Sequence, residues 1–129
     1  MMELLNHPNT IFVFGSNLSG IHGAGAARTA HVHWGAEWGV GEGLTGKSYA
    51  LPTKEKDVKT TRTNEAILGS LRTFVLFAMG RPDLIFLVTP VGCGLAGLKE
   101  DNVRGMLIEA GGPTKNMLLT ASWFDPRVF

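Results

Sequence analysis

Short apolar runs alternate with polar and glycine-rich stretches along this sequence. Residues 11–14 form an apolar, partly β-branched run that ends at Gly15, which is typical of a buried strand. Residues 84–88 (Leu-Ile-Phe-Leu-Val) form a second run of strand length. Its unbroken hydrophobicity predicts a central parallel strand that is covered on both faces.

Two weaker runs predict two further strands. Residues 48–51 (Ser-Tyr-Ala-Leu) resemble a strand that is stopped by Pro52, because proline cannot donate a backbone hydrogen bond. Residues 116–121 are predicted to form the last strand of the chain. The glycine-rich stretch 35–46 is expected to be a loop or an irregular hairpin.

Three segments between these runs predict helices. Residues 64–79 carry apolar side chains at positions 67, 68, 71, 74, 75 and 78, which is one buried helical face. Residues 24–30 are rich in alanine, as expected of a helix that packs closely on a sheet, and should end before Gly35. Residues 100–110 supply a third helix, and the Gly-Gly-Pro sequence at 111–113 should stop it.

The order of these elements, β-α-β-α-β-α-β, predicts the fold class. It favours an α/β fold of three layers, α/β/α, in which helices cover a mostly parallel sheet. The chain has 129 residues, which suits one domain with its own core. Residues 1–129 are therefore expected to form a single domain.

Charge and cysteine content narrow the classes of function. The formal net charge is only +1, so any contact with nucleic acid must be local, for example at the basic stretch 54–62. Cys93 is the only cysteine, which excludes an intramolecular disulfide. Residues 1–5 lack the basic and apolar regions of a signal peptide, and no run approaches the roughly 20 apolar residues of a membrane span. We expect a cytoplasmic protein that does not span a membrane.

Glycine is the unusual component of this composition. Most of the 17 glycines lie in residues 15–46 and 92–112. Ligands of parallel α/β sheets bind beyond the carboxyl ends of the strands, where helix N-termini present free N–H groups to anions. Two segments occupy such places, the first loop (residues 15–27, beginning with Gly15 and Ser16) and the second loop (residues 91–97). They suggest a diphosphate ligand, although glycine-rich turns after strands are often only tight turns.

The two loops together resemble those of the macrodomain family. The motifs are Gly-Ala-Gly-Ala-Ala at 23–27 and Gly-Cys-Gly-Leu-Ala-Gly at 92–97, and the resemblance extends from Ile11 to about Trp123. It implies binding of ADP-ribose and, in many members, hydrolysis of ADP-ribosyl bonds. It also implies that the distal ribose contacts Asn17, Gly23, Ala24 and Gly25, the diphosphate contacts Gly92, Cys93, Gly94, Leu95 and Ala96, and the adenine is covered by Trp123 or Phe124.

Within that family, the sequence Pro52-Thr53-Lys54 resembles the branch that contains the terminal ADP-ribose glycohydrolase and the antitoxin that removes ADP-ribose from DNA. The resemblance implies that Lys54 attacks the anomeric carbon of the ribose as a nucleophile, a role that suits a lysine amine. Asn17 or His22 would assist. His22 lies inside the first loop, where it either reaches the ribose hydroxyls and transfers a proton or only closes the turn. Ala96 stands where the glycohydrolase has a catalytic aspartate, and no aspartate precedes Phe12 to bind the adenine amino group. Whether the chain hydrolyses ADP-ribosyl bonds or only binds its ligand therefore stays open. The mode of adenine recognition stays open as well.

The expected partner is ADP-ribose or a related small molecule, either free or attached to a macromolecule, and no cofactor or metal is implied. Residues 41–48 match the P-loop pattern letter for letter, but they precede a predicted strand rather than a helix, so this interpretation is disfavoured. His31 and His33 are too close together for one helical face and are expected to be exposed or capping. Cys93 is either an activated thiolate or, as the resemblance favours, a residue that contributes only its backbone.

Overall fold

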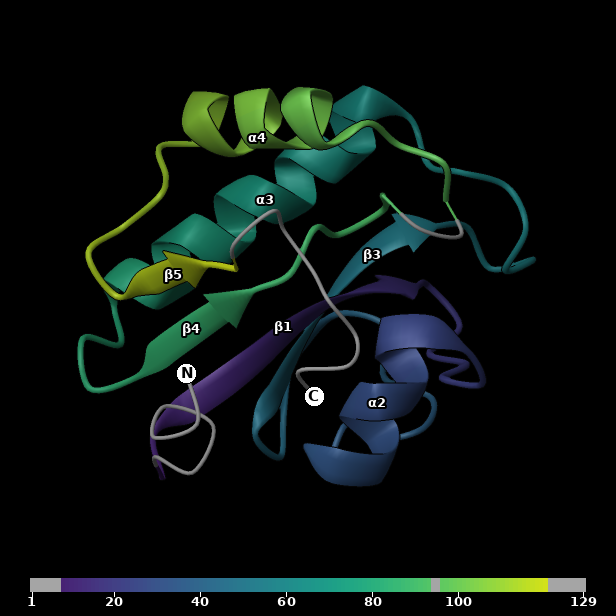
Figure 1. The fold of residues 1–129 in the computed structure, drawn as a ribbon. Helices are drawn as coiled ribbons and strands as arrows, with labels where there is room; N and C mark the ends of the chain where they lie inside the picture. The colour runs from purple at the N-terminus through teal and green to yellow at the C-terminus, as the bar shows by residue number, and fades with distance from the viewer. Residues whose placement is uncertain (1–7, 94–95, 121–129) are drawn as a thin grey trace.

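The computed structural model describes residues 8–93 and 96–120, and these residues form one five-stranded sheet and three helices (Figure 1). The strands are β1 (Thr10–Asn17), β2 (Gly43–Thr45), β3 (Ser48–Lys54), β4 (Ile85–Val88) and β5 (Met117–Leu119). The helices are α2 (Gly25–His33), α3 (Asn64–Met79) and α4 (Glu100–Glu109). The predicted α/β class is confirmed.

The sheet is mostly parallel, as predicted, and has the order β2-β3-β1-β4-β5. β1 lies in the middle and pairs in parallel with β3 and β4, and β5 pairs in parallel with β4. β2 is antiparallel to β3 and forms a hairpin with it. The run at 84–88 is thus an interior strand, and β1 is the central one.

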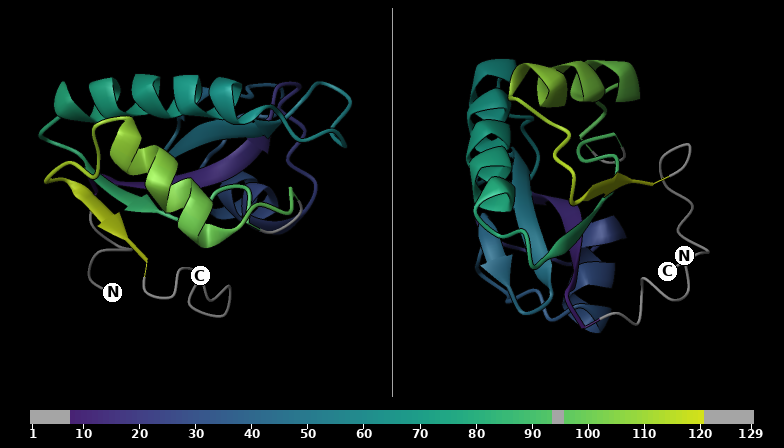
Figure 2. Two further views of the ribbon diagram at one scale, coloured as in Figure 1. Left: turned by 90° about the horizontal axis from the view of Figure 1, so that it is seen from above. Right: turned by 90° about the vertical axis from the view of Figure 1, so that its left-hand side faces the viewer.

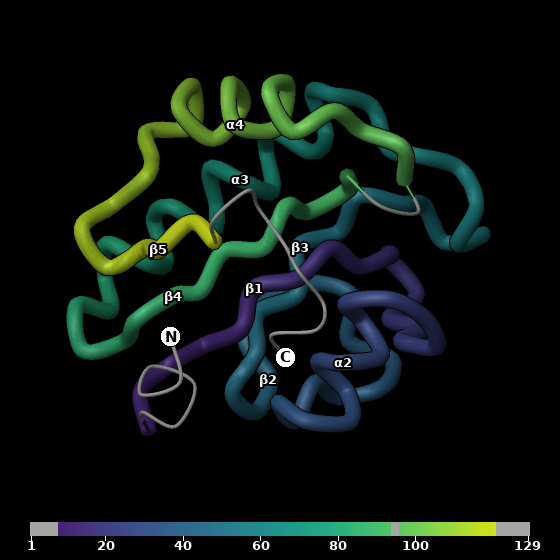
Figure 3. Tube along the Cα trace, viewed as in Figure 1, coloured from purple at the N-terminus to yellow at the C-terminus, as the bar shows by residue number. Residues whose placement is uncertain are grey.

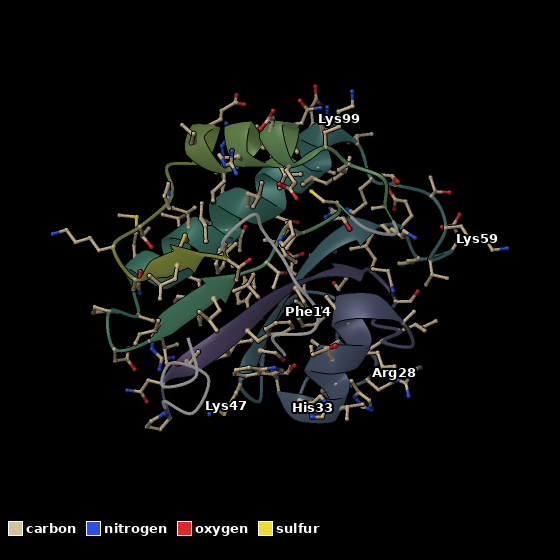
Figure 4. The ribbon with its side chains drawn as sticks, viewed as in Figure 1. Phe14, Arg28, His33, Lys47, Lys59 and Lys99 are labelled. Carbon is tan, nitrogen blue, oxygen red and sulfur yellow. The ribbon has the colours of Figure 1, made fainter. Side chains whose placement is uncertain are left out.

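Helices cover both faces of this sheet. Successive side chains of a strand point to opposite faces, so the apolar residues of β1 contribute to a core on each side. Ile11 and Val13 of β1 belong to the core cluster that also contains buried residues of α3 and α4. Phe12 and Phe14 belong to a second cluster with Ala27 and other residues of α2. Figure 2 shows α3 and α4 on one side of the sheet and α2 on the other, and in Figure 4 the labelled Phe14 lies beside α2.

The boundaries of α3 coincide with those predicted from its periodicity. The hydroxyl of Thr63 accepts a hydrogen bond from the backbone N–H of Ala66 at 3.2 Å, which caps the N-terminus. The chain leaves the helix at Gly80. Local capping and one buried face therefore agree on this element.

The prediction that Pro52 stops its strand is wrong, because β3 continues to Lys54. β2 pairs with β3 only from Ser48 to Ala50, so beyond Ala50 a proline interrupts no hydrogen bond to β2. Pro52 lies opposite Ser16 in the parallel pair with β1. The longer β3 carries Lys54 to the same edge of the sheet as Asn17.

The carboxyl ends of β1, β3 and β4 point toward one side of the molecule, as the tube in Figure 3 shows. The loops that follow these strands gather there. None of the helices that the structure describes has both the length and the apolar character needed to cross a membrane.

Candidate functional site

A pocket of about 710 Å³ opens at the carboxyl ends of β1, β3 and β4. Both glycine-rich loops border it, together with the N-terminus of α2 and the loop after β3. The residues that line it are Gly15, Ser16, Asn17, Ile21, Gly23, Ala24, Gly25, Ala26, Ala27, Thr29, Thr53, Lys54, Val58, Thr89, Pro90, Val91, Gly92, Cys93, Ala96 and Glu100. Its size is that of a small-molecule site, for which roughly 300–1,000 Å³ is usual.

Most of the residues predicted for the site meet in this pocket, although they come from segments far apart in the sequence. The first loop contributes Gly15, Ser16, Asn17, Gly23, Ala24 and Gly25, β3 contributes Lys54, and the second loop contributes Gly92, Cys93 and Ala96. The predicted residues Gly94, Leu95, Trp123 and Phe124 lie outside the described residues.

The side chains of Ser16 and Asn17 shape the first loop from within. The hydroxyl of Ser16 donates to the carbonyl of Gly41, so it is engaged behind the pocket. Asn17 is buried, and its amide Nδ2 donates to the carbonyl of Ile21 at 2.9 Å while its Oδ1 accepts from the N–H of Ile21 at 3.0 Å. Asn17 thus closes the turn that begins the first loop.

The N-terminus of α2 faces the pocket without a side-chain cap. Helix α2 begins at Gly25 after Ala24, and within the described part of the chain its N-cap makes no side-chain hydrogen bond. Such groups need a partner, and together with the positive end of the helix dipole they attract anions. This end of the pocket therefore suits a phosphate group.

The second loop approaches the end of β1 closely. Gly92 has a φ of +77°, in the region that favours glycine, and a Cβ there would lie 2.5 Å from Cδ1 of Leu98. A Cβ on Gly15 would lie 3.0 Å from the backbone nitrogen of Gly92. Glycine at these two positions lets two loops border one cavity.

Two ionisable side chains of opposite charge line the pocket. Lys54 is half-buried at the end of β3, where its carbonyl also accepts from the N–H of Leu18 at 3.0 Å. Glu100 is the first residue of α4. The pocket therefore contains one amine and one carboxylate among mostly backbone and apolar groups. This combination suits a ligand with both phosphate and sugar hydroxyl groups.

The structure does not place the His22 side chain at the pocket, where the sequence predicted it. The residue is 1% exposed, and its ring packs edge-on against Phe14 and Trp38. Its Nε2 donates to the carbonyl of Glu37 at 3.1 Å. Burial lowers the pKa of His22 below its ordinary value of 6.5. His22 packs the first loop from behind, so we assign it no contact with a ligand.

Cys93 lines the pocket but lacks the environment of an activated thiolate. Burial, and secondarily the negative charge of Glu100, raises the pKa of its thiol to about 11. Reactive thiolates need the opposite electrostatic environment. The structure thus disfavours the activated thiolate. The backbone N–H of Cys93 donates to the carbonyl of Pro90 at 3.1 Å, so a backbone contact with a ligand stays a prediction.

Outside the two loops and Lys54, sequence reasoning missed six lining residues: Thr29, Thr53, Val58, Thr89, Pro90 and Glu100. Thr53 and Thr89 could have been found from the predicted strands, because residues at the carboxyl ends of parallel strands lie at the same edge of the sheet. Glu100 begins the helix after the second loop, where an acidic residue is expected on dipole grounds alone. No sequence signal indicated Val58.

The segment that matches the P-loop pattern forms a β-hairpin and not a P-loop. Residues 43–45 form β2, residues 46–47 form the turn and Ser48 begins β3, so no helix follows the lysine. His31 and His33 lie exposed in the last turn of α2, as predicted. Within residues 8–93 and 96–120 no three or more His, Cys, Asp or Glu side chains gather in an arrangement that could hold a metal ion.

Comparisons with protein-family models, with curated proteins and with solved structures found no match to this chain.

Proposed function

We propose that this chain binds ADP-ribose, or another NAD-derived ADP-ribosyl compound, in the pocket at the carboxyl ends of β1, β3 and β4. The observation that supports this most strongly is that the two glycine-rich loops, 64 or more positions apart in sequence, border a single cavity of about 710 Å³. A macrodomain-like arrangement is part of the proposal. Helices on both faces of a mostly parallel sheet support it.

The polar groups of the pocket suit the parts of such a ligand. The uncapped first turn of α2 and the turn at Gly92 offer backbone N–H groups to the diphosphate. The Lys54 amine supplies a positive charge, and the Glu100 carboxylate can accept from ribose hydroxyls. The ligand would thus lie across the ends of the three strands.

Calorimetric titration with ADP-ribose tests the proposal. The informative variant is Gly23→Glu, because Gly23 lines the pocket and the nearest atom to an added Cβ is Trp38 Cη2 at 3.9 Å, so there is room for a Cβ at this position. The new carboxylate should repel the diphosphate and lower the affinity by about tenfold or more. Gly69→Glu is the matched control, since Gly69 lies exposed on α3 with nothing within 4 Å.

Wild-type protein and Gly69→Glu should bind ADP-ribose with similar affinity. Absence of binding to wild-type protein at millimolar ADP-ribose would sink the proposal. Equal affinity of Gly23→Glu and wild type would place the ligand elsewhere on the molecule.

A second candidate activity is hydrolysis of ADP-ribosyl bonds with Lys54 as nucleophile, which its half-buried position in the same pocket favours. The neutral amine would attack the anomeric carbon of the distal ribose while the bond to the attached group breaks and that group leaves with a proton. Opening of the sugar ring gives an imine to Lys54, and water then releases free ADP-ribose and regenerates the amine. The alternative is a module that binds or sequesters the ligand without chemistry.

Borohydride reduction during turnover of an ADP-ribosylated peptide or oligonucleotide distinguishes the two. Hydrolysis through Lys54 predicts an ADP-ribose adduct on wild-type protein, located at Lys54 by mass spectrometry. Lys54→Arg keeps the positive charge but cannot form the imine, so it should bind ADP-ribose and form no adduct. Binding without release or adduct in wild type would establish the non-catalytic alternative.

A further inference from the structure

Val58 adopts a backbone conformation that valine rarely takes. Its φ is +59°, and among the residues that the structure describes it is the one non-glycine residue with a positive φ. The left-handed region is costly for a side chain branched at Cβ. Strained residues persist where their surroundings determine them, and they gather at ligand contacts and clamps. The left-handed conformation of Val58 must therefore be stabilised by its surroundings.

Asp57 holds the chain in this conformation. Its Oδ1 accepts from the N–H groups of Lys59 at 2.9 Å and Thr60 at 2.8 Å, and its Oδ2 accepts from the Thr60 hydroxyl at 2.6 Å. These hydrogen bonds to the charged carboxylate lower the pKa of Asp57 to about 2. The N–H of Val58 itself donates to the carbonyl of Glu55 at 3.1 Å. The turn is thus fixed from both sides.

The same loop, residues 55–61, is tied to both glycine-rich loops. The hydroxyl of Ser19 in the first loop donates to the carbonyl of Lys56 at 2.7 Å. The hydroxyl of Thr61 donates to the carbonyl of Ala96 in the second loop at 2.9 Å. The 55–61 loop therefore bridges the two sides of the pocket.

Val58 is half-buried and lines the pocket, whereas its neighbour Lys59 is exposed and lies at the outer edge of the molecule (Figure 4). Glycine would adopt this φ at lower cost, so the strain favours a role for the side chain. A valine offers only methyl groups, which suit the carbon face of a sugar or a base and not a phosphate. The part of the ligand that suits Val58 therefore differs from the diphosphate, which suits the backbone N–H groups of the pocket.

We propose that Val58 is a specificity-determining residue, an apolar wall that the 55–61 loop holds against the sugar or base of the ligand at the expense of backbone strain. The identity of that ligand as an ADP-ribosyl compound rests on the function proposed above. The proposal predicts that stability and affinity change in opposite directions when the side chain is removed.

The experiment compares Val58→Gly, Val58→Thr and Lys59→Gly with wild type, by thermal unfolding without ligand and by calorimetry with ADP-ribose and with pyrophosphate at about 0.15 M salt. Val58→Gly should raise the melting temperature by roughly 2–6 °C, because the strain is relieved. It should weaken ADP-ribose binding by about tenfold and leave pyrophosphate binding within about twofold.

Val58→Thr keeps the branched shape and the strained φ, so its melting temperature should stay near that of wild type. Its affinity for ADP-ribose should lie between those of wild type and Val58→Gly, because a hydroxyl replaces one of the two methyl groups. Lys59→Gly introduces the same flexibility one residue later without relieving strain or touching the pocket. It should keep the affinity within about twofold and should not raise the melting temperature.

Three results would overturn the proposal. If Val58→Gly binds ADP-ribose as tightly as wild type, the side chain is not a ligand contact, and the proposed function is unaffected. If Lys59→Gly loses as much affinity as Val58→Gly, loop flexibility and not the valine side chain explains the loss. If wild-type protein binds no ADP-ribose, the proposed function fails and this proposal fails with it.

Discussion

The side-chain amide of Asn17 forms two hydrogen bonds with one residue, Ile21, donating to its carbonyl and accepting from its N–H. Asn17 ends β1, and Ile21 lines the pocket with 43% of its surface exposed. This pair joins the rigid sheet to the first loop at one point. The contribution of Asn17 to the site is therefore to hold the loop, whether or not it also touches the ligand.

Asn17→Ala should lower the free energy of unfolding by about 2 kcal/mol, because it leaves both backbone groups of Ile21 without these partners. Asn17→Asp keeps the acceptor but sets a buried carboxylate oxygen against the carbonyl of Ile21 in place of the Nδ2 donor, so its loss of stability should be at least as large. Urea unfolding measures both. Equal stability of Asn17→Ala and wild type would show that the turn does not depend on this side chain.

The close approach of Gly15 to Gly92 gives a second prediction. In Gly15→Ala the new Cβ meets the backbone nitrogen of Gly92 at 3.0 Å and Cα of Val91 at 3.5 Å, and backbone atoms cannot move aside by changing rotamer. We expect a destabilisation of about 1–3 kcal/mol and weaker ADP-ribose binding, because the second loop must shift.

Gly69→Ala is the control for this substitution. Gly69 lies inside α3 and nothing stands within 4 Å of an added Cβ, so alanine should stabilise the helix by up to about 1 kcal/mol. Denaturation of the two variants under the same conditions measures the difference. A Gly15→Ala protein as stable as wild type would show that the loops tolerate a wider separation.

The elements of the fold could be predicted wherever local pattern and tertiary burial agree. α3 has the predicted bounds because its buried positions Ile67, Leu71 and Phe74 repeat at the helical period and Thr63 caps it. The end of β3 could not be predicted in the same way. Whether Pro52 breaks a strand depends on where β2 stops pairing, which is a tertiary fact.

The position of the candidate site could be predicted, but the direction of individual side chains could not. Strand order brings Gly15, Lys54 and Gly92 to one edge, which follows from a parallel sheet. His22 lies in the correct loop, yet its ring turns toward Phe14, and that choice depends on packing of the distant Trp38. Periodicity carries no information about such a turn.

Cys93 should react slowly with alkylating reagents at neutral pH. Because burial and Glu100 raise the thiol pKa from 9.0 to about 11, the thiolate fraction is small, and alkylation by iodoacetamide should be at least about tenfold slower than that of an exposed cysteine. The rate should rise steeply toward about pH 11. In Glu100→Gln the repulsive charge is absent, so the reaction should be faster than in wild type. Mass spectrometry of the adduct measures these rates, and rapid alkylation at neutral pH would contradict the burial of the thiol.

The burial of His22 predicts a loss of stability in mild acid. Its pKa lies below the ordinary 6.5 in the folded protein, chiefly because burial disfavours the charged ring. The unfolded chain therefore binds the proton at a higher pH than the folded chain does. The contribution of His22 to stability is present in full above about pH 6.5 and is lost as the pH falls through that value toward the folded pKa.

The urea midpoint should fall between about pH 7 and pH 5 in wild type and in His33→Gln, whose side chain is exposed, and the fall should be smaller in His22→Gln. The lowered pKa values of Asp57 and Asp83 place their effects at lower pH, below the ordinary carboxyl range, so they do not contribute in this window. An equal pH dependence in His22→Gln and wild type would show that another group is responsible.

His22 directly precedes the pocket residue Gly23, so protonation that loosens the packing of His22 should also weaken ADP-ribose binding over the same pH range. The affinity of His22→Gln for ADP-ribose should then vary less with pH than that of wild type.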